Sequence, residues 1–280
     1  GVTDKNWMRE LIGLINYNVQ KLLDLVDQTL ALSRIENDTL MFHACVPLNE
    51  DGSLKEANIY GSVLAGRALF DAIDEYVRTA FEDPDPEARK KGRDLLWYLW
   101  LGEGSPLFAK SKMATFERAF IEEAETHKEE KGAYYTLREQ EEICDRILDE
   151  FGVTGMHRHI INGHVPVRSN QGENPIKANG KMLVIDGGFS RPYHLETGIA
   201  GYTLVYHSRG FQLVQHEPFE SRAKAIEEGL DIKSTTIVVE LSSHRQMVKD
   251  TDKGKELVTQ IQDLKKLLVA YRTGLIKEKV

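Results

Sequence analysis

Two histidines of the chain, His43 and His164, each follow a run of apolar residues. A neutral imidazole at the end of a strand can bind a metal ion through one nitrogen while an acceptor holds the other nitrogen. The small neighbours Ala44 and Gly163 would let a ligand approach closely, and Pro166 would stiffen the loop that follows. The same pattern also fits a core histidine that hydrogen-bonds to the backbone, so both interpretations stay open.

Three further groups of residues could do chemistry or fill a structural role. His157 and His159 alternate on one strand face and could chelate a metal, although a solvated sheet face is the more common case. Asp186 ends an apolar run before a glycine, so it either orients a metal ligand or forms a turn. Lys110 and Lys112 follow a Gly/Pro segment, where they could bind a phosphate or face the solvent.

Hydrophobic periodicity predicts the elements that must position these residues. Helices are expected at 5–35, 60–82, 111–127, 136–151, 221–229 and 255–273, with another helix starting at Pro86. Strands are expected at 39–46, 157–162, 181–186, 199–207, 210–216 and 235–241. The last helix carries one apolar stripe, which is formed by Leu257, Ile261, Leu264, Leu268 and Tyr271.

This order of elements indicates an α/β chain with one domain and no internal repeat. The helices at 111–151 are expected to form a cap or insertion within that domain. A capping box, Thr136-x-x-Glu139, predicts the start of the second of these helices, and Gly152 predicts its end.

The composition of the chain argues against several classes of protein, namely nucleic-acid-binding, membrane-spanning and disulfide-rich proteins. The chain has 280 residues, 41% of them hydrophobic and 29% charged, and a formal net charge of −8, so no basic surface indicates a nucleic-acid partner. The longest apolar run, 95–101, is too short to span a membrane. Cys45 and Cys144 lie far apart, which favours a reducing compartment, the cytoplasm, over a disulfide scaffold. The sequence begins with Gly1 rather than Met. This start is expected for the downstream part of a longer protein, and equally for a processed or tagged N-terminus.

Three segments resemble the class III fructose-1,6-bisphosphatases, and they occur in order along nearly the whole chain. They are MFHACVPLNEDG (41–52), SPLFAKSKMATFER (105–118) and NGHVPVRSNQGENPIKANGKMLVIDGGFSRPYHLETGIAGYTL (162–204). That family resembles the calcineurin-like metallophosphoesterases, whose fold is an α/β/β/α sandwich with two metal ions. The resemblance therefore implies that this chain is the C-terminal portion of such a sandwich.

The superfamily has five ordered motifs, and this chain matches only the last two. Asp-x-His, Gly-Asp-x-x-Asp-Arg-Gly and Gly-Asn-His-Glu are absent from the sequence. The fourth motif matches His43, although Ala44-Cys45 stands where many relatives have Gly-Gly. The fifth matches Gly163-His164, with Pro166 where other branches often carry a second histidine. By resemblance, His43 and His164 are ligands of one metal site, and the remaining ligands belong to a missing N-terminal part of the same protein.

The resemblance also implies a reaction. It is the two-metal hydrolysis of the 1-phosphate of fructose 1,6-bisphosphate in gluconeogenesis, with Mn²⁺ as the metal and with a bridging water of lowered pKa. The 280-residue chain alone is expected to be inactive, and a homo-oligomer is compatible with the family. Alternatives are another metallophosphoesterase, acting on phosphoproteins or dinucleotides, and a metal-free interaction domain on the same fold. The candidates for contacts to the substrate phosphates are Arg168, Arg191, Lys110 and Lys112.

Overall fold

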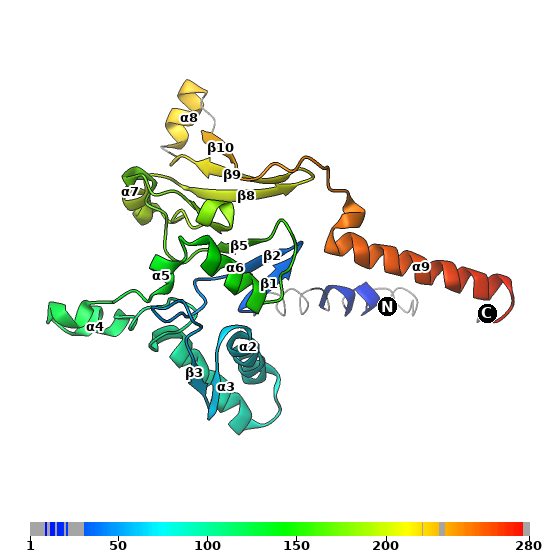
Figure 1. Ribbon diagram of the computed structural model, residues 1–280, viewed down its shortest axis with the longest axis horizontal. Helices are drawn as coiled ribbons and strands as arrows, with labels where there is room; N and C mark the ends of the chain where they lie inside the picture. Colours follow the sequence, from blue (N-terminus) through cyan, green and yellow to red (C-terminus); the bar gives the residue numbers. More distant parts are fainter. Residues whose placement is uncertain are drawn as a thin grey trace, which may run out of the picture. The chain divides into compact units, whose positions relative to one another are not determined.

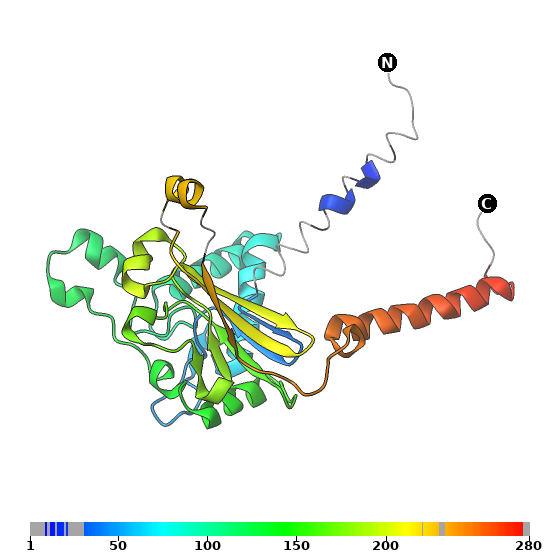
Figure 2. The same cartoon turned by 90° about the horizontal axis from the view of Figure 1, so that it is seen from above.

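The computed structural model describes residues 9, 12–14, 16–19, 21, 31–219, 221–229 and 233–276 (Figures 1 and 2). The chain divides into two compact units. Unit 1 comprises residues 1–34 and 42–137, and unit 2 comprises residues 35–41 and 138–280. The larger segment of unit 1, residues 42–137, is therefore inserted between the two segments of unit 2 in the sequence.

Unit 1 is mainly helical. It contains the hairpin β3 (Ala57–Ile59) and β4 (Ser62–Leu64), helices α2 (Gly66–Glu82), α3 (Pro86–Leu101), α4 (Thr115–Phe120) and α5 (Tyr134–Leu137), and the 3-10 turn η1 (Ala124–His127). Asp85 caps α3 by accepting from the Glu87 N–H, and Pro86 occupies the first turn. Helices α2 and α3 approach closely at Gly92, where a Cβ atom would lie 2.6 Å from the Ala80 Cβ. Their facing sides form an apolar core that includes Leu69, Ile73 and Leu95.

Unit 2 is built on a mixed sheet of strand order β1-β2-β5-β7-β6. The strands are β1 (Ser33–Glu36), β2 (Thr39–Phe42), β5 (His159–Asn162), β7 (Met182–Val184) and β6 (Ile176–Lys177). Strands β2, β5 and β7 run parallel, with Met41 opposite Ile161 and Ile161 opposite Leu183. All four residues of β5 are buried, as expected for the central strand of a parallel group.

An antiparallel sheet, β10-β9-β8, completes the strands of unit 2 (Figure 1). It consists of β8 (Gly201–His207), β9 (Gly210–His216) and β10 (Ser234–Val238). Val184, Tyr202 and Leu213 form one apolar cluster together with Val167 and Ile199, which joins the β7 end to this second sheet. The helices are α6 (Glu141–Glu150), α7 (His194–Thr197), α8 (Arg222–Glu228) and α9 (Asp252–Arg272), with the 3-10 turns η2 (Ser169–Gln171), η3 (Ala178–Gly180), η4 (Arg191–Tyr193) and η5 (Val248–Asp250).

Several predicted elements differ from the structure. The strand at residues 33–36 replaces the end of the helix expected at 5–35. The described residues between 9 and 21 are helical, and the rest of 1–30 lies outside the described residues. The helix expected at 60–82 begins only at Gly66, because a hairpin occupies 57–64. The predicted capping box is wrong, since Thr136 lies inside α5 and α6 begins at Glu141 without a side-chain cap. The expected end at Gly152 is confirmed by its left-handed φ of 75°.

The mixed α and β fold class is confirmed. The boundary between the units falls at Leu137, so α4 and α5 of the expected 111–151 insertion belong to unit 1 and α6 belongs to unit 2. None of the described helices combines the length and the apolar content that a membrane span requires.

Candidate functional site

The carboxyl end of β5 leads directly into a three-residue turn centred on His164. The Val165 N–H donates to the Gly163 carbonyl at 2.9 Å, and His164 between them has a φ of 69°. This is the pattern of a γ-turn with positive φ, which is rare and strained for a residue with a side chain. Backbone strain of this kind persists where surrounding structure holds it, and it gathers at functional sites. The His164 side chain is half-buried.

The loop after His164 is held at several points. Val167 is fully buried, and its N–H donates to the Asp186 carbonyl at 2.8 Å. The Arg168 N–H donates to a Glu173 carboxylate oxygen at 3.0 Å, and Ser169 Oγ lies 2.6 Å from the Tyr202 hydroxyl. These bonds fix the backbone that carries His164 and Arg168 to the neighbouring strand end and to the second sheet.

Glu173 belongs to a partly buried ion network that sequence reasoning missed. The buried Lys177 ammonium lies 3.3 Å from Glu173 and 2.8 Å from Glu139. Burial raises the pKa of Glu173, but the Arg168 N–H and the nearby Lys177 charge outweigh burial and hold that pKa below its usual range. The carboxylate therefore stays ionised at neutral pH and acts as a fixed acceptor for the loop. No local pattern in the segment 168–173 distinguishes Glu173 from a surface glutamate.

Asp186 forms a turn. Its Oδ1 accepts from the Gly188 N–H at 2.9 Å, two residues along the chain, as in an Asx-turn. Of the two roles that its sequence allowed, the observed contact is the turn-forming one.

Arg168 and Arg191, both predicted to contact phosphate, are exposed residues of unit 2. Arg191 begins η4 and lines a cavity of about 1160 Å³ together with Phe189, His194, Leu195, His216 and Phe219. That cavity combines one guanidinium and two imidazoles with exposed apolar side chains. A role of Arg168 or Arg191 in substrate binding stays a prediction.

The predicted lysines of unit 1 both have protein partners. The Lys110 ammonium lies 2.8 Å from a Glu129 carboxylate oxygen, with side-chain exposures of 18% and 10%. Lys112 donates to the Thr126 carbonyl at 2.5 Å and lies 3.3 Å from Glu117. Both contacts tie 110–112 to the segment after α4, so these lysines have a structural role whether or not they also bind phosphate.

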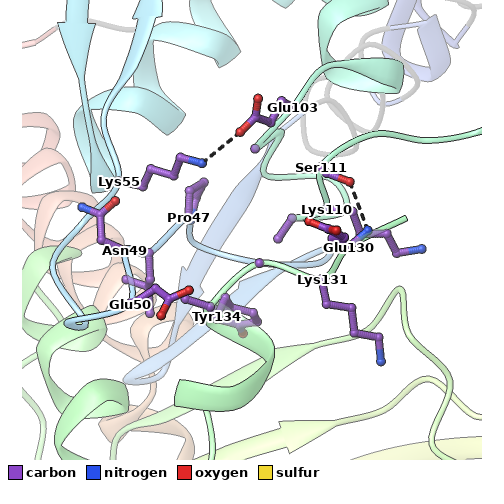
Figure 3. Close-up of a pocket in the computed structure, with 15 residues that line it drawn as sticks. Pro47, Asn49, Glu50, Lys55, Glu103, Lys110, Ser111, Glu130, Lys131 and Tyr134 are labelled. Carbon is purple, nitrogen blue, oxygen red and sulfur yellow. Dashed lines mark hydrogen bonds and ion pairs between the residues drawn. The ribbon is translucent and has the colours of Figure 1, made fainter. Parts of the chain in front are cut away.

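Lys110 also lines a cavity of about 350 Å³ in unit 1 (Figure 3). Lys55, Glu103, Ser111 and Lys131 contribute to the same walls. Lys55 pairs with Glu103 at 3.5 Å, and Figure 3 shows Lys131 extending in a different direction. The lysines of this cavity therefore do not converge on one point as the ligands of a single phosphate would.

His43 is exposed and directly follows β2, so its side chain does not lie in the core. Cys45, two residues on, is buried; its N–H donates to the Pro106 carbonyl at 3.2 Å. Burial raises the pKa of the Cys45 thiol well above its usual range, and burial raises that of Cys144 to about 12. Both cysteines are free and uncharged, which does not suit them to bind a metal or act as nucleophiles.

His157 and His159, at the amino end of β5, bond to one carboxylate. His157 Nδ1 and His159 Nε2 each contact an oxygen of Glu240, the latter at 2.7 Å, and His159 Nδ1 lies 2.9 Å from the Gly180 carbonyl. His159 is only 6% exposed, so the expected solvated face is wrong for this residue. Both of its ring nitrogens are therefore engaged within the protein.

The metal-ligand set is incomplete in the described part of the chain. Imidazole nitrogens suit Mn, Fe or Zn, and His43 is exposed whereas His164 is half-buried. The described ranges contain no group of three or more His, Cys, Asp or Glu side chains that could hold a metal ion. The two histidines alone do not make a complete site, and their predicted proximity stays a prediction.

Comparisons with known proteins point to one family. The model of the family described as Firmicute fructose-1,6-bisphosphatase matches residues 14–273. A class 3 fructose-1,6-bisphosphatase of Parabacteroides distasonis is 80% identical over 244 residues, 87% of this chain and 37% of that protein. Proteins of the same name from Phocaeicola vulgatus and Clostridium botulinum are 67% and 56% identical, over 88% and 86% of this chain.

The chain spans about 37% of the length of the first of these relatives. No solved structure matches it. Because the family model covers more than nine-tenths of the sequence in one continuous match, the chain belongs to the Firmicute fructose-1,6-bisphosphatase family.

Proposed function

We propose that this chain contributes to the hydrolysis of the 1-phosphate of fructose 1,6-bisphosphate, yielding fructose 6-phosphate and phosphate in gluconeogenesis. The observation that carries the proposal is the strained turn at His164, in a chain whose relatives are named fructose-1,6-bisphosphatase. A left-handed histidine at the carboxyl end of a buried parallel strand is costly for stability alone. It fits a residue that is held in place to bind a ligand.

The proposed fold is the C-terminal portion of an α/β/β/α sandwich; of the α-helices in the insertion expected at 111–151, only α4 and α5 lie outside unit 2. The two sheets of unit 2, joined by the apolar cluster around Val184 and Leu213, support this assignment. We place the protein in the cytoplasm, which the two buried free thiols support.

His43 and His164 are the proposed metal ligands of this chain, and Mn²⁺ is the proposed metal. Each histidine follows a strand, and β2 and β5 are parallel neighbours with Met41 opposite Ile161. When bound, the metals would activate a water and neutralise phosphate charge. Arg168 and Arg191 would contribute guanidinium groups that bind phosphate oxygens in pairs.

The absence of three metal motifs from the sequence gives this proposal a sharp test. We expect little phosphate release from fructose 1,6-bisphosphate with Mn²⁺ when the 280-residue chain is assayed alone. A polypeptide that adds Asp-x-His, Gly-Asp-x-x-Asp-Arg-Gly and Gly-Asn-His-Glu segments should restore it. Equal turnover by both proteins would show that the absent motifs are not required.

A panel of phosphoproteins, dinucleotides and sugar phosphates separates this function from related phosphoesterases. Metal analysis of the extended protein separates it from an interaction domain. Preference for fructose 1,6-bisphosphate together with bound Mn²⁺ supports the proposal. A metal-free protein without turnover on any member of the panel would contradict it.

A further inference from the structure

Helix α9 is fixed to unit 2 at its first turn. The Asn37 N–H donates to Asp252 Oδ2 at 2.7 Å, and the Asp252 N–H donates back to Asn37 Oδ1 at 2.9 Å. Thr251 caps the helix by accepting from the Gly254 N–H, and Gly254 is buried where a Cβ atom would lie 1.6 Å from the Val248 carbonyl oxygen. The start of α9 is therefore rigidly placed, and Figure 2 shows the helix running away from the sheets of unit 2.

Beyond that first turn, α9 exposes a complete apolar stripe. The stripe residues are between 40% and 63% exposed and are spaced alternately by four and three positions: Leu257, Ile261, Leu264, Leu268 and Tyr271. This spacing averages 3.5 residues, the repeat of a coiled-coil seam. Val258 and Leu267 flank the seam and are also exposed, which widens the apolar face. A well-capped helix of 21 residues with such a face requires a packing partner.

The residues of the seam favour a second copy of the same helix. In heptad notation, Ile261 and Leu268 take the a positions, whereas Leu257, Leu264 and Tyr271 take the d positions. The combination of Ile261 at an a position with Leu257 and Leu264 at d positions is typical of parallel two-stranded pairs, although Leu268 occupies the second a position. No polar or charged residue interrupts the seam, so identical layers would meet along a two-fold axis without a buried charge.

The residues that flank the seam are compatible with a parallel pairing. In a parallel pair, Gln260 would face Lys265 of the other copy and Leu267 would face Arg272, so no like charges meet.

We propose that the chain forms a two-fold dimer through parallel pairing of α9. The dimer interface consists of the five seam residues of each copy, with Val258 and Leu267 packing along its edges. The interface belongs to unit 2 alone and does not depend on the proposed catalytic activity.

The mass of the 280-residue chain tests this proposal, as measured by sedimentation equilibrium over a concentration series. We expect a monomer–dimer equilibrium that Leu264→Lys weakens at least tenfold, because a lysine would enter the middle of the seam. The matched control is Thr259→Lys, which places the same side chain on the opposite face and should leave the equilibrium unchanged. A monomer at every concentration, an unaffected dimer in Leu264→Lys, or assembly beyond two copies would overturn the proposal.

A second variant tests the direction of the pairing and does not depend on the folding of the lysine variant. Leu268→Cys should form a covalent dimer on mild oxidation, because residue 268 faces its own counterpart in a parallel pair. Lys266→Cys, on the outer face, should not. The native Cys45 and Cys144 are buried and should not contribute. A persistent non-covalent dimer that fails to cross-link through residue 268 would overturn the parallel arrangement.

Discussion

At the amino end of β5, His157 and His159 bond to the carboxylate of Glu240, whereas at the carboxyl end His164 is distinguished by its left-handed backbone and partial exposure. The contacts of His157 and His159 with Glu240 give buried polar groups hydrogen-bond partners and connect the end of β10 to β5. Their role is therefore to stabilise the fold. The arrangement at His164 holds a side chain in a strained position, which is a cost to stability that a binding role would explain. Histidines near the two ends of one strand thus differ in their surroundings, and their spacing in the sequence alone does not reveal this difference.

The largest expected effect is that of His164→Ala in a protein that carries all five metal motifs. Loss of the imidazole should reduce turnover by orders of magnitude while the thermal midpoint changes little. His164→Gly is the backbone control, since glycine accepts positive φ without strain and should leave the protein at least as stable, yet inactive. Melting curves and kcat at saturating Mn²⁺ check both variants. Near-normal turnover with a clearly lowered midpoint would assign His164 a structural role instead.

Glu240→Gln should have the next largest effect. We expect this substitution to lower the free energy of unfolding and to leave turnover unchanged. The substitution keeps the side chain's shape but removes the charge that bonds to two imidazoles, one of them buried. Hydrogen bonds to charged groups contribute about 1.5–3 kcal/mol, and we expect a loss of that order in the free energy of unfolding. Glu227→Gln, on the exposed helix α8, is the control. Urea titration at neutral pH measures the difference between the two variants.

The same contact predicts a pH dependence of stability. Burial raises the pKa of Glu240, but the hydrogen bonds from His159 and His157 outweigh burial and lower that pKa below its usual range. A lowered carboxyl pKa stabilises the fold at pH values above the unfolded pKa of about 4.3, and this contribution is lost as the pH falls through the folded pKa. The difference in unfolding free energy between wild type and Glu240→Gln should therefore shrink below about pH 4. A difference that stays constant down to pH 3 would contradict this account.

His157→Gln should have the smallest effect. The His157 side chain is 56% exposed, so solvent screens its contact with Glu240. We expect a loss of about 0.2–1 kcal/mol in the free energy of unfolding, as for other exposed ion pairs. His159→Gln, which changes the buried partner, should cost more. Equal losses of unfolding free energy in His157→Gln and His159→Gln would show that the exposed and the buried histidine contribute equally to stability, contrary to this prediction.

Sequence periodicity predicted the long and locally specified elements. The start of α3 at Asp85-Pro86, the hairpin β8–β9 and helix α9 follow from caps, alternation and a continuous stripe. The β3–β4 hairpin was missed because each strand has three residues, too few for alternation to be distinguished from a helical period. The capping box failed because tertiary packing buries Tyr134 and Tyr135 in a short helix that takes up Thr136.

The candidate site was predictable only in part. The positions of His43 and His164 after strands could be recognised from the apolar runs that precede them. The strain at His164 depends on a backbone bond between Gly163 and Val165, and no residue preference announces it. Glu240 contacts His159 across 81 positions of sequence, and such a pairing depends on how two sheets meet rather than on any local pattern.

The insertion of unit 1 between β2 and β5 has a consequence for the order of folding. Met41 pairs with Ile161, and the loop between them contains all of 42–137. Closing so long a flexible loop costs entropy before the parallel strands gain any stability. The helical hairpin α2–α3, by contrast, joins neighbours in sequence and can form early. We expect unit 1 to acquire protection from hydrogen exchange during refolding before the amides of β5 do, because a structured insertion shortens the effective loop that β2 and β5 must close.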